Sequence, residues 1–226
     1  CGCCGAPLCL VLQVTLEKAP EPFRRRGGEE GYFQFFYCIS GSCSVKSAWE
    51  PFQGNSLARR ISGETSKVKA PSGGYEEIPI VGWTAVPEGP GWEDRFALPI
   101  PKDFLNGDLF STFAEMAQTE SDGYYDEAFA YFGLLGDSRP EIFDLVRTLP
   151  GDKLLGWPFW SQGVEYPQCP TCGAQMEMLV QINNDGFGTG APGFGSALGQ
   201  VFAGDGNGHV SHCPQHGQMT FAWACG

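Results

Sequence analysis

The chain has 226 residues, of which 18% are charged, and it carries a formal net charge of −12. This length suits one large or two small domains with a buried core. No stretch approaches the roughly 18 unbroken apolar residues of a membrane-spanning helix, and the start lacks the charged and apolar regions of a signal peptide. The sequence therefore predicts no membrane partner. Because it begins at Cys1 rather than at Met, we also expect further residues upstream.

The charge is unevenly distributed along the chain. Residues 1–75 contain nine basic and six acidic side chains, whereas residues 76–226 contain five basic and 20 acidic side chains. A phosphate backbone is repelled by such a negative field, which argues against nucleic acid as a partner of the C-terminal part. The charge favours a basic protein as partner.

The N-terminal part predicts a cysteine pair followed by two strands. Cys1 and Cys4 precede an apolar run from Leu8 to Val14, which has the length of a strand and is too short for a helix. Tyr32 to Tyr37 is aromatic except for one Gln, which is typical of a strand packed on both faces or covered on its outer face. Between them, Arg24 to Arg26 is followed by two glycines, and we expect an exposed turn. Contact with phosphate or RNA is the alternative for these arginines.

The middle of the chain changes character twice. Residues 53–101 are rich in Gly, Pro and Ser without a clear period, and within them Ile78 to Trp83 can form an edge strand, because Pro79 excludes a central position. Residues 103–149 carry apolar side chains at helical spacing, and Ser138 to Glu141 has the form of a capping box. Eight acidic residues and one basic residue lie within 115–144. We expect an acidic helical insert whose charges are either a solvated face or a binding face.

The last third contains the strongest motif. Two ligand pairs, each separated by two residues, flank an apolar strand-like segment from Met176 to Ile182. Such pairs clamp a tetrahedral zinc ion, since each pair holds the metal from one tight turn. We therefore expect zinc on Cys169, Cys172, Cys213 and His216.

The beginning of the chain repeats this pattern, which indicates an internal duplication. Gln13 falls where Gln181 falls, and the segment from Gly31 to Cys38 aligns without a gap on Gly206 to Cys213. Cys43 then stands near the place of His216, and Trp49 near that of Trp223. The repeat predicts a second zinc site on Cys1, Cys4, Cys38 and Cys43. It would have three ligands if Cys1 does not bind.

The remaining candidates have simpler explanations. His212 could replace His216 as a ligand, but in the repeat it matches Tyr37, which is a strand residue. Cys3, Cys9 and Cys225 have no partner at ligand spacing, and the last two are expected to be small buried hydrophobic residues. The ten cysteines could form disulfides in an exported protein. The pairing with His216 instead favours metal in a reducing compartment, and hence a cytoplasmic protein.

One segment resembles a known family. Gly151 to Gln162, followed by the Cys169 pair, the Met176–Ile182 segment and Cys213, resembles the YwqG-like domain of bacteria. That domain is related to eukaryotic programmed cell death protein 2 and its ribosome-maturation relatives. The resemblance implies a duplicated β-rich fold with variable zinc knuckles. For the eukaryotic relatives it implies dedicated chaperones of a ribosomal protein. The sequence departs from the family in lacking a Gly/Trp/Pro segment before its first cysteine pair.

We therefore expect an α+β, mainly β fold of internally duplicated units, each with a zinc knuckle. The expected parts are a first zinc-knuckle unit (1–52), an irregular connection (53–102), an acidic helical insert (103–149) and a second zinc-knuckle unit (150–226). They can also form one pseudo-symmetric domain. The expected function is a zinc-stabilised protein-binding module, chaperone-like toward a basic partner. The alternatives are a hydrolase with a site between the two units, or a structural subunit of a larger assembly.

Overall fold

A computed structural model of the chain describes residues 1–41, 43, 48–62, 79–86, 148–183 and 206–225. The chain divides into two compact units, Cys1–Ala85 with Pro150–Gly226, and Val86–Leu149. The acidic helices expected within 103–149 lie outside the described residues, which resume at Thr148. All elements below belong to the first unit.

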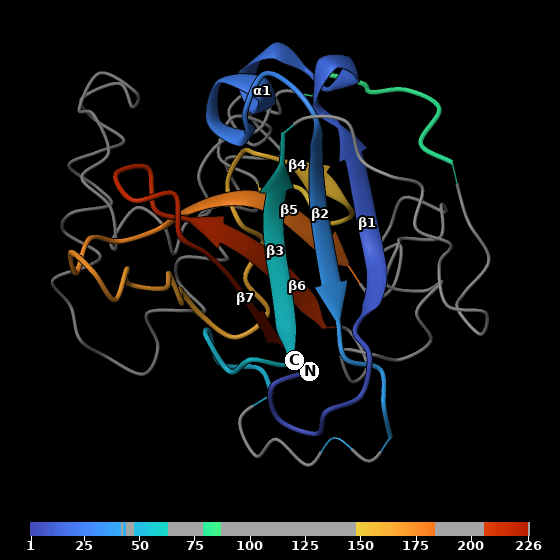
Figure 1. Cartoon of the computed structure of the whole chain (residues 1–226). Coiled ribbons are helices and arrows are strands. Elements are labelled where there is room, and N and C mark those ends of the chain that lie inside the picture. The colour runs from blue at the N-terminus through green and yellow to red at the C-terminus, as the bar shows by residue number, and fades with distance from the viewer. Residues whose placement is uncertain (42, 44–47, 63–78, 87–147, 184–205, 226) are drawn as a thin grey trace, which may run out of the picture. The chain divides into compact units, whose positions relative to one another are not determined.

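The first sheet is antiparallel, with strand order β1-β2-β3 (Figure 1). Its strands are β1 (Cys9–Thr15), β2 (Tyr32–Tyr37) and β3 (Ser56–Ile61). Side chains alternate between its faces, and five apolar ones on the inner face are buried: Leu12, Val14, Phe33, Phe35 and Tyr37. The first two strands confirm the prediction from sequence.

The second sheet is antiparallel with the order β4-β5-β6-β7. Its strands are β4 (Lys153–Leu154), β5 (Glu177–Asn183), β6 (Asn207–His212) and β7 (Met219–Ala224). Every residue of β6 is buried, as is all of β5 after Glu177. Both faces of these two strands are therefore covered, which explains why β5 reads as a continuous apolar run.

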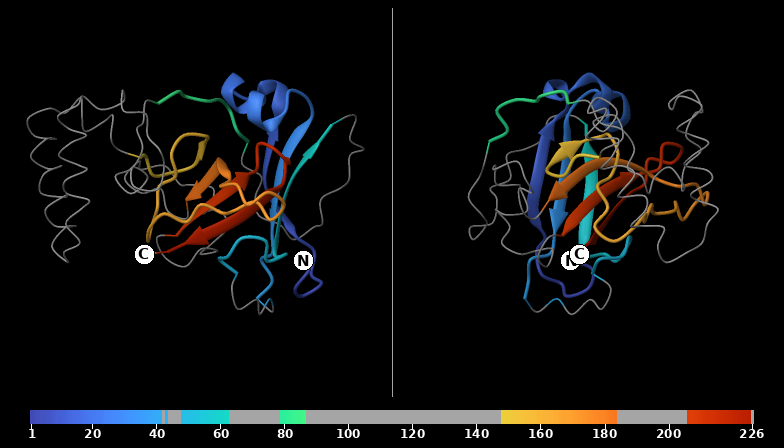
Figure 2. Two further views of the ribbon diagram at one scale, coloured as in Figure 1. Left: turned by 90° about the vertical axis from the view of Figure 1, so that its left-hand side faces the viewer. Right: turned by 180° about the vertical axis from the view of Figure 1, so that it is seen from behind.

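The inner faces of the two sheets share one hydrophobic core, and their strands cross in the views of Figures 1 and 2. The Phe35 ring from β2 lies 4.6 Å from the Phe221 ring of β7, and Tyr37 lies 5.5 Å from Phe221. Each such aromatic side chain contributes about 1.5–3 kcal/mol by leaving water. The core thus joins strands from opposite ends of the chain. The fold is mainly β, as expected.

The first two long strands of each sheet pair in the same register. Cys9 faces Tyr37 and Thr15 faces Tyr32 in the first sheet; Glu177 faces His212 and Asn183 faces Asn207 in the second. Each pairing is interrupted at the same place, between Leu10 and Leu12 and between Met178 and Val180. The Gln13–Gln34 pair of the first sheet therefore has its counterpart in Gln181–His209 of the second.

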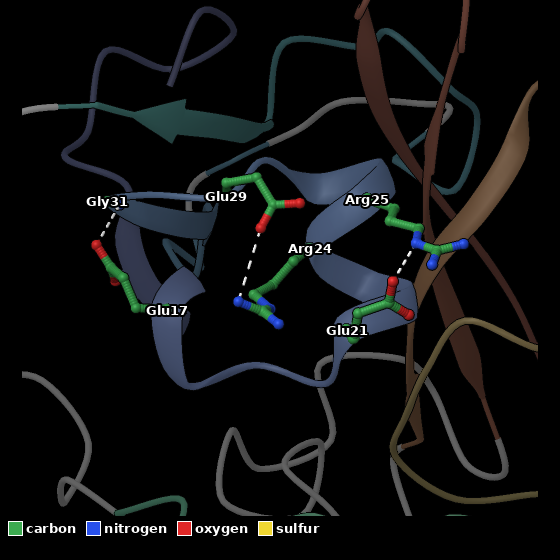
Figure 3. Close-up of polar contacts among 6 residues, drawn as sticks. All are labelled: Glu17, Glu21, Arg24, Arg25, Glu29 and Gly31. Carbon is green, nitrogen blue, oxygen red and sulfur yellow. Dashed lines mark hydrogen bonds and ion pairs between the residues drawn. The ribbon is translucent and has the colours of Figure 1, made fainter.

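The connection from β1 to β2 is helical, which corrects the expected exposed turn at Arg24–Arg26. It contains a 3₁₀ turn, η1 (Leu16–Lys18), and the helix α1 (Glu21–Gly27), which has Pro in its first turn and all three arginines in its last. Pro suits a helix start, and cations near the C-terminal end interact favourably with the helix dipole. Arg25 pairs with Glu21, and Arg24 lies 3.7 Å from Glu29 (Figure 3). Seven residues are too few to show helical periodicity in the sequence.

Three further expectations require correction. The strand β3 lies inside the stretch 53–101, for which the sequence showed no period; Leu57, Arg59 and Arg60 are exposed there, so the strand carries no clear apolar alternation. Conversely, Pro79 to Trp83 forms no strand. Trp49 lies in a turn and does not occupy a strand position like that of Trp223. No helix in the described part of the chain is long and apolar enough to cross a membrane.

Candidate metal centres

The first group of ligands lies at one end of the first sheet. Cys1 and Cys4 precede β1, Cys38 directly follows β2, and Cys43 lies in the β2–β3 connection. The Sγ atoms of Cys1 and Cys43 are 3.7 Å apart, as are those of Cys4 and Cys38. All four sulfurs lie within 4.8 Å of one another and can hold a metal ion.

The second group lies at the corresponding end of the second sheet. Cys169 and Cys172 precede β5, whereas Cys213 and His216 follow β6. Cys172 Sγ lies 3.8 Å from Cys213 Sγ, and His216 Nδ1 lies 3.6 Å from Cys213 Sγ and 4.0 Å from Cys169 Sγ. These four donor atoms also lie within 4.8 Å of one another. The eight residues singled out in the sequence are thus the eight that the fold brings together.

These distances fit a metal rather than disulfides. A disulfide has sulfurs about 2.05 Å apart, and all ten cysteines are free. A tetrahedral ion with metal–sulfur bonds of about 2.3 Å holds its sulfurs about 3.8 Å apart. A metal–nitrogen bond of about 2.0–2.1 Å gives a sulfur–nitrogen separation of about 3.6 Å. The closest donor pairs of both groups match these separations.

Three of the ligand turns are closed in the same way. The backbone N–H of Gly5 donates to the carbonyl of Cys1, that of Gly173 to Cys169, and that of Gly217 to Cys213, at 2.8–2.9 Å. Each of these glycines has a positive φ, between 64° and 74°, which glycine adopts at little cost. Gly217, directly after His216, is the turn signal that sequence reasoning did not use.

Further backbone hydrogen bonds connect the ligand-bearing turns to neighbouring segments of the chain. The Cys169 N–H donates to the carbonyl of Ala174, and that of Cys213 to Gln218. The first group shows the same contacts from the Cys1 nitrogen to the Ala6 carbonyl and from the Cys38 N–H to the Asn55 carbonyl. The ligand positions are therefore held by backbone geometry in both groups.

Hydrogen bonds from the ligand turns favour the thiolate form of two of the cysteines, which is the form that binds a cation. Burial alone would raise the pKa of Cys169, but the N–H groups of Cys172 and Thr171, with the thiols of Cys213 and Cys172, lower that pKa to about 6. The hydrogen bond from the Ala174 N–H favours a lower pKa for Cys172, but burial, the thiols of Cys169 and Cys213 and the charge on Cys169 together raise that pKa. In the first group the N–H of Ala6 lowers the pKa of the Cys4 thiol. A bound dication removes the repulsion between neighbouring thiolates, since coordinating thiols lose their protons outright.

The other candidates lie outside both groups. His212 is buried within β6 and is not one of the ligands that the fold gathers. Cys3 donates to the carbonyl of Gln53, whereas Cys9 and Cys225 are half-buried. Burial raises the pKa of the Cys9 thiol, as expected for a small apolar residue.

A buried polar network, which sequence reasoning missed, holds residues 151–162 against the outer face of the second sheet. The Gln181 side chain accepts from the Phe159 N–H at 2.7 Å and donates to the Gly151 carbonyl at 2.8 Å. Asn207 donates to Ser161 Oγ at 2.7 Å. His209 lies 3.3 Å from Gln181 Oε1 and stacks edge-on with Trp160. The signal available in the sequence was the match between Gln13 and Gln181.

Comparison of the chain with protein-family models, with curated protein sequences and with solved structures finds no match.

Proposed function

We propose that each ligand group binds one zinc ion and that both ions stabilise the fold. Three thiols with one imidazole, or four thiols, form the donor set that zinc takes in structural sites. Each group offers four donor atoms, so a tetrahedral ion has no position left for water or substrate. The donors come from two separate loops in each case, and the metal therefore joins segments far apart in the chain. The same donor set suits a reducing compartment, which supports a cytoplasmic location.

The proposal includes an internal duplication of a zinc-knuckle unit. It is supported by the identical strand registers, by the matching irregularity in β1 and β5, and by the matching hydrogen bonds of the ligand turns. One position departs from the sequence alignment. Trp223 pairs with Gly208, the counterpart of Phe33, and Phe33 pairs with Arg60. The counterpart of Trp223 is therefore Arg60 rather than Trp49.

The zinc-stabilised fold acts, in this proposal, as a protein-binding module. The observation that carries it is the aromatic surface of the β2–β3 connection: Trp49 is 48% exposed and Phe52 is 45% exposed. Both residues are nevertheless anchored, since the Trp49 carbonyl accepts from the Trp223 N–H at 3.0 Å and the Phe52 N–H donates to Thr220 Oγ1 at 2.8 Å. Ordered, exposed aromatic side chains are typical of protein-binding surfaces.

Backbone strain at Phe52 supports the same function. Its φ is 64°, in a region that costs a non-glycine residue about 1–3 kcal/mol. Gly would relieve that strain, yet an aromatic residue stands there and points partly into solvent. A partner that covers the ring explains its presence. The net charge of −12 makes that partner a basic protein, and the resemblance noted above suggests a chaperone-like role toward it.

The hydrolase alternative finds less support. It needs a metal with an open position or a nucleophile beside a base. Both gathered groups supply four donors, and His209 is buried beneath Trp160 with a pKa lowered by burial to about 3.

The experiment compares association with the partner between variants. The partner is first identified by affinity capture from the native cell and mass spectrometry, and is then purified. Trp49→Ala is expected to weaken its binding at least tenfold. Trp83→Ala removes another tryptophan that is 40% exposed and should leave binding unchanged. A partner bound equally well by both variants contradicts the assigned surface.

The charge part of the proposal is tested separately. Asp122, Asp126 and Glu127 are changed together to Lys. Charge attraction acts over about 8 Å at physiological salt and mainly accelerates encounter. The triple variant should associate more slowly, with a flatter dependence on salt. An unchanged association rate at low salt would mean that these charges only solvate the protein.

A further inference from the structure

An open pocket of about 440 Å³ borders the second metal centre, whose ligand Cys213 forms part of its wall. Its walls come from four elements and one metal loop: Arg25 and Arg26 of α1, Arg60 of β3, Glu177 of β5, His212 of β6, and the loop 213–217. Both sheets and the helix between β1 and β2 thus contribute to it. None of the charged side chains in its wall is a metal ligand.

The wall of the pocket is positively charged. It holds three guanidinium groups against one carboxylate, in a chain whose net charge is −12. Arg26 lies 3.4 Å from Glu177, and Arg25 pairs with Glu21. Within the described part of the chain the side chain of Arg60 forms no hydrogen bond or ion pair, whereas its backbone pairs with Phe33 in the sheet. The pocket therefore has positive charge in excess of its own acidic group.

Arg60 is placed there by close packing. Its Cδ lies 3.5 Å from where a Cβ on Gly28 would stand, so its aliphatic part passes close to the end of α1. Partial burial lowers the pKa of its guanidinium. Arg60 is nevertheless exposed as a whole residue, so a bound anion can reach it from solvent.

His212 gives a second, independent indication of a ligand. Its side chain is only 4% exposed, and neither ring nitrogen has a hydrogen-bond partner among the described residues. The nearest charged group is Glu177, whose Oε2 lies 3.8 Å from Nε2. Leaving a buried donor without an acceptor costs about 1–3 kcal/mol. Because His212 lines the pocket, an oxygen of a bound anion can supply the missing acceptor.

From these observations we propose that the pocket binds a phosphate monoester group, with Arg60 and Arg26 as its principal ligands and His212 as an N–H donor. The planar guanidinium fork matches two phosphate oxygens, which makes Arg the preferred residue for this group. A carboxylate is a poorer fit, since Glu177 already presents one to Arg26. The pocket is larger than a phosphate alone and has room for the group that carries it.

The test measures binding of inorganic phosphate and of O-phosphoserine to the metal-loaded protein by calorimetry at low ionic strength. Arg60→Gln should weaken both at least tenfold. Arg59→Gln is the matched control. Arg59 is the neighbouring arginine of β3, but its side chain donates to Gln34 Oε1 and lies over the Phe36 ring, outside the pocket wall. This control should change either affinity less than twofold.

Further measurements distinguish a phosphate ester from free phosphate as the ligand, and exclude misfolding or loss of zinc as the cause of weaker binding. Tighter binding of O-phosphoserine indicates an ester or a phosphorylated residue as ligand, whereas equal binding indicates free phosphate; both support the site. Unchanged circular dichroism and zinc content of Arg60→Gln would show that it folds. Arg60→Lys keeps the charge but loses the fork, and should recover only part of the affinity. Three results would overturn the proposal. The first is absence of binding at about 10 mM phosphate, an affinity weaker than the millimolar range. The others are an equal loss of phosphate affinity in Arg59→Gln, and acetate binding as tightly as phosphate.

Discussion

Trp223 Nε1 donates a hydrogen bond to Tyr37 Oη at 3.2 Å, joining the last strand of the second sheet to the middle strand of the first. The same N–H lies 3.2 Å from the Ala48 carbonyl, which also accepts from Asn55. One indole therefore links both sheets and the β2–β3 connection that carries the exposed aromatic residues.

Trp223→Phe should destabilise the protein by about 0.5–1.5 kcal/mol, because it removes the indole N–H that Tyr37 Oη and the Ala48 carbonyl share. Chemical denaturation measures the change. Trp49→Phe is the control, since Trp49 contacts Trp223 only through its backbone carbonyl, which accepts from the Trp223 backbone N–H, and not through its ring nitrogen. Equal losses in the two variants would contradict a specific role for the Trp223 N–H.

Metal content should follow the two ligand groups independently. Reduced wild-type protein is expected to hold two zinc ions, and Cys4→Ser or Cys172→Ser about one each. Cys225→Ser should still hold two, because Cys225 belongs to neither group. Elemental analysis of the purified variants checks this.

Removal of both ions by a strong chelator should lower the melting temperature sharply. Ligand binding energy becomes folding energy in such sites, with apparent values of about 10–16 kcal/mol in zinc-finger peptides. The loops 1–5 and 213–217 should lose protection from hydrogen exchange first. Unchanged melting after verified metal removal would show that the ions do not support the fold.

Gly31→Ala should cost about 2–4 kcal/mol of stability. A Cβ at this position would stand 1.9 Å from the Ile61 carbonyl oxygen, and φ is +93°. Its N–H also binds the Glu17 carboxylate at 2.9 Å (Figure 3). Gly41→Ala is the control, since a Cβ there meets nothing within 4 Å, and its effect should stay within about 0.5 kcal/mol. A Gly31→Ala variant as stable as wild type would disprove this close approach.

The buried imidazole of His209 should make the free energy of unfolding decrease at acid pH. Burial, with a smaller effect of the Lys153 charge, lowers the pKa of its imidazole from 6.5 to about 3. Between these values the unfolded chain binds a proton that the folded chain does not. Above pH 6.5 His209 is neutral in both states and does not reduce the free energy of unfolding. As the pH falls from 6.5 toward 3, the free energy of unfolding decreases by up to about 1.4 kcal/mol per pH unit.

The comparison with His209→Gln isolates this contribution, because acid loss of the metals affects both proteins alike. Gln is the residue found at the matching position of the first sheet, Gln34, and keeps a hydrogen-bonding side chain toward Gln181. Denaturation at several pH values should show a shallower decline for the variant. Parallel curves would mean that the pKa of His209 is the same in the folded and the unfolded chain, and would contradict the effect of burial.

Ligand spacing was readable in the sequence because it is local. Cys169 and Cys172, or Cys213 and His216, need only one tight turn to face a common metal, and the glycine after each pair marks that turn. The aromatic run Tyr32–Tyr37 and the apolar run before Val14 likewise identify strands without knowledge of their neighbours. Matching the two halves of the chain then placed Cys38 and Cys43 with Cys1 and Cys4.

Only the tertiary structure decided the features that depend on residues far apart in the chain. β3 forms because β2 offers it a hydrogen-bonding edge, not because Ser56–Ile61 has a strand-like apolar pattern. The arginines of α1 and Arg60 are separated by more than 30 residues, and only the packing of α1 beside β3 and β5 brings them around His212. Sequence determines the ligand pairs and the tight turns that carry them, because these depend on neighbours within a few residues. The charge inside a pocket depends on which side chains the fold gathers there.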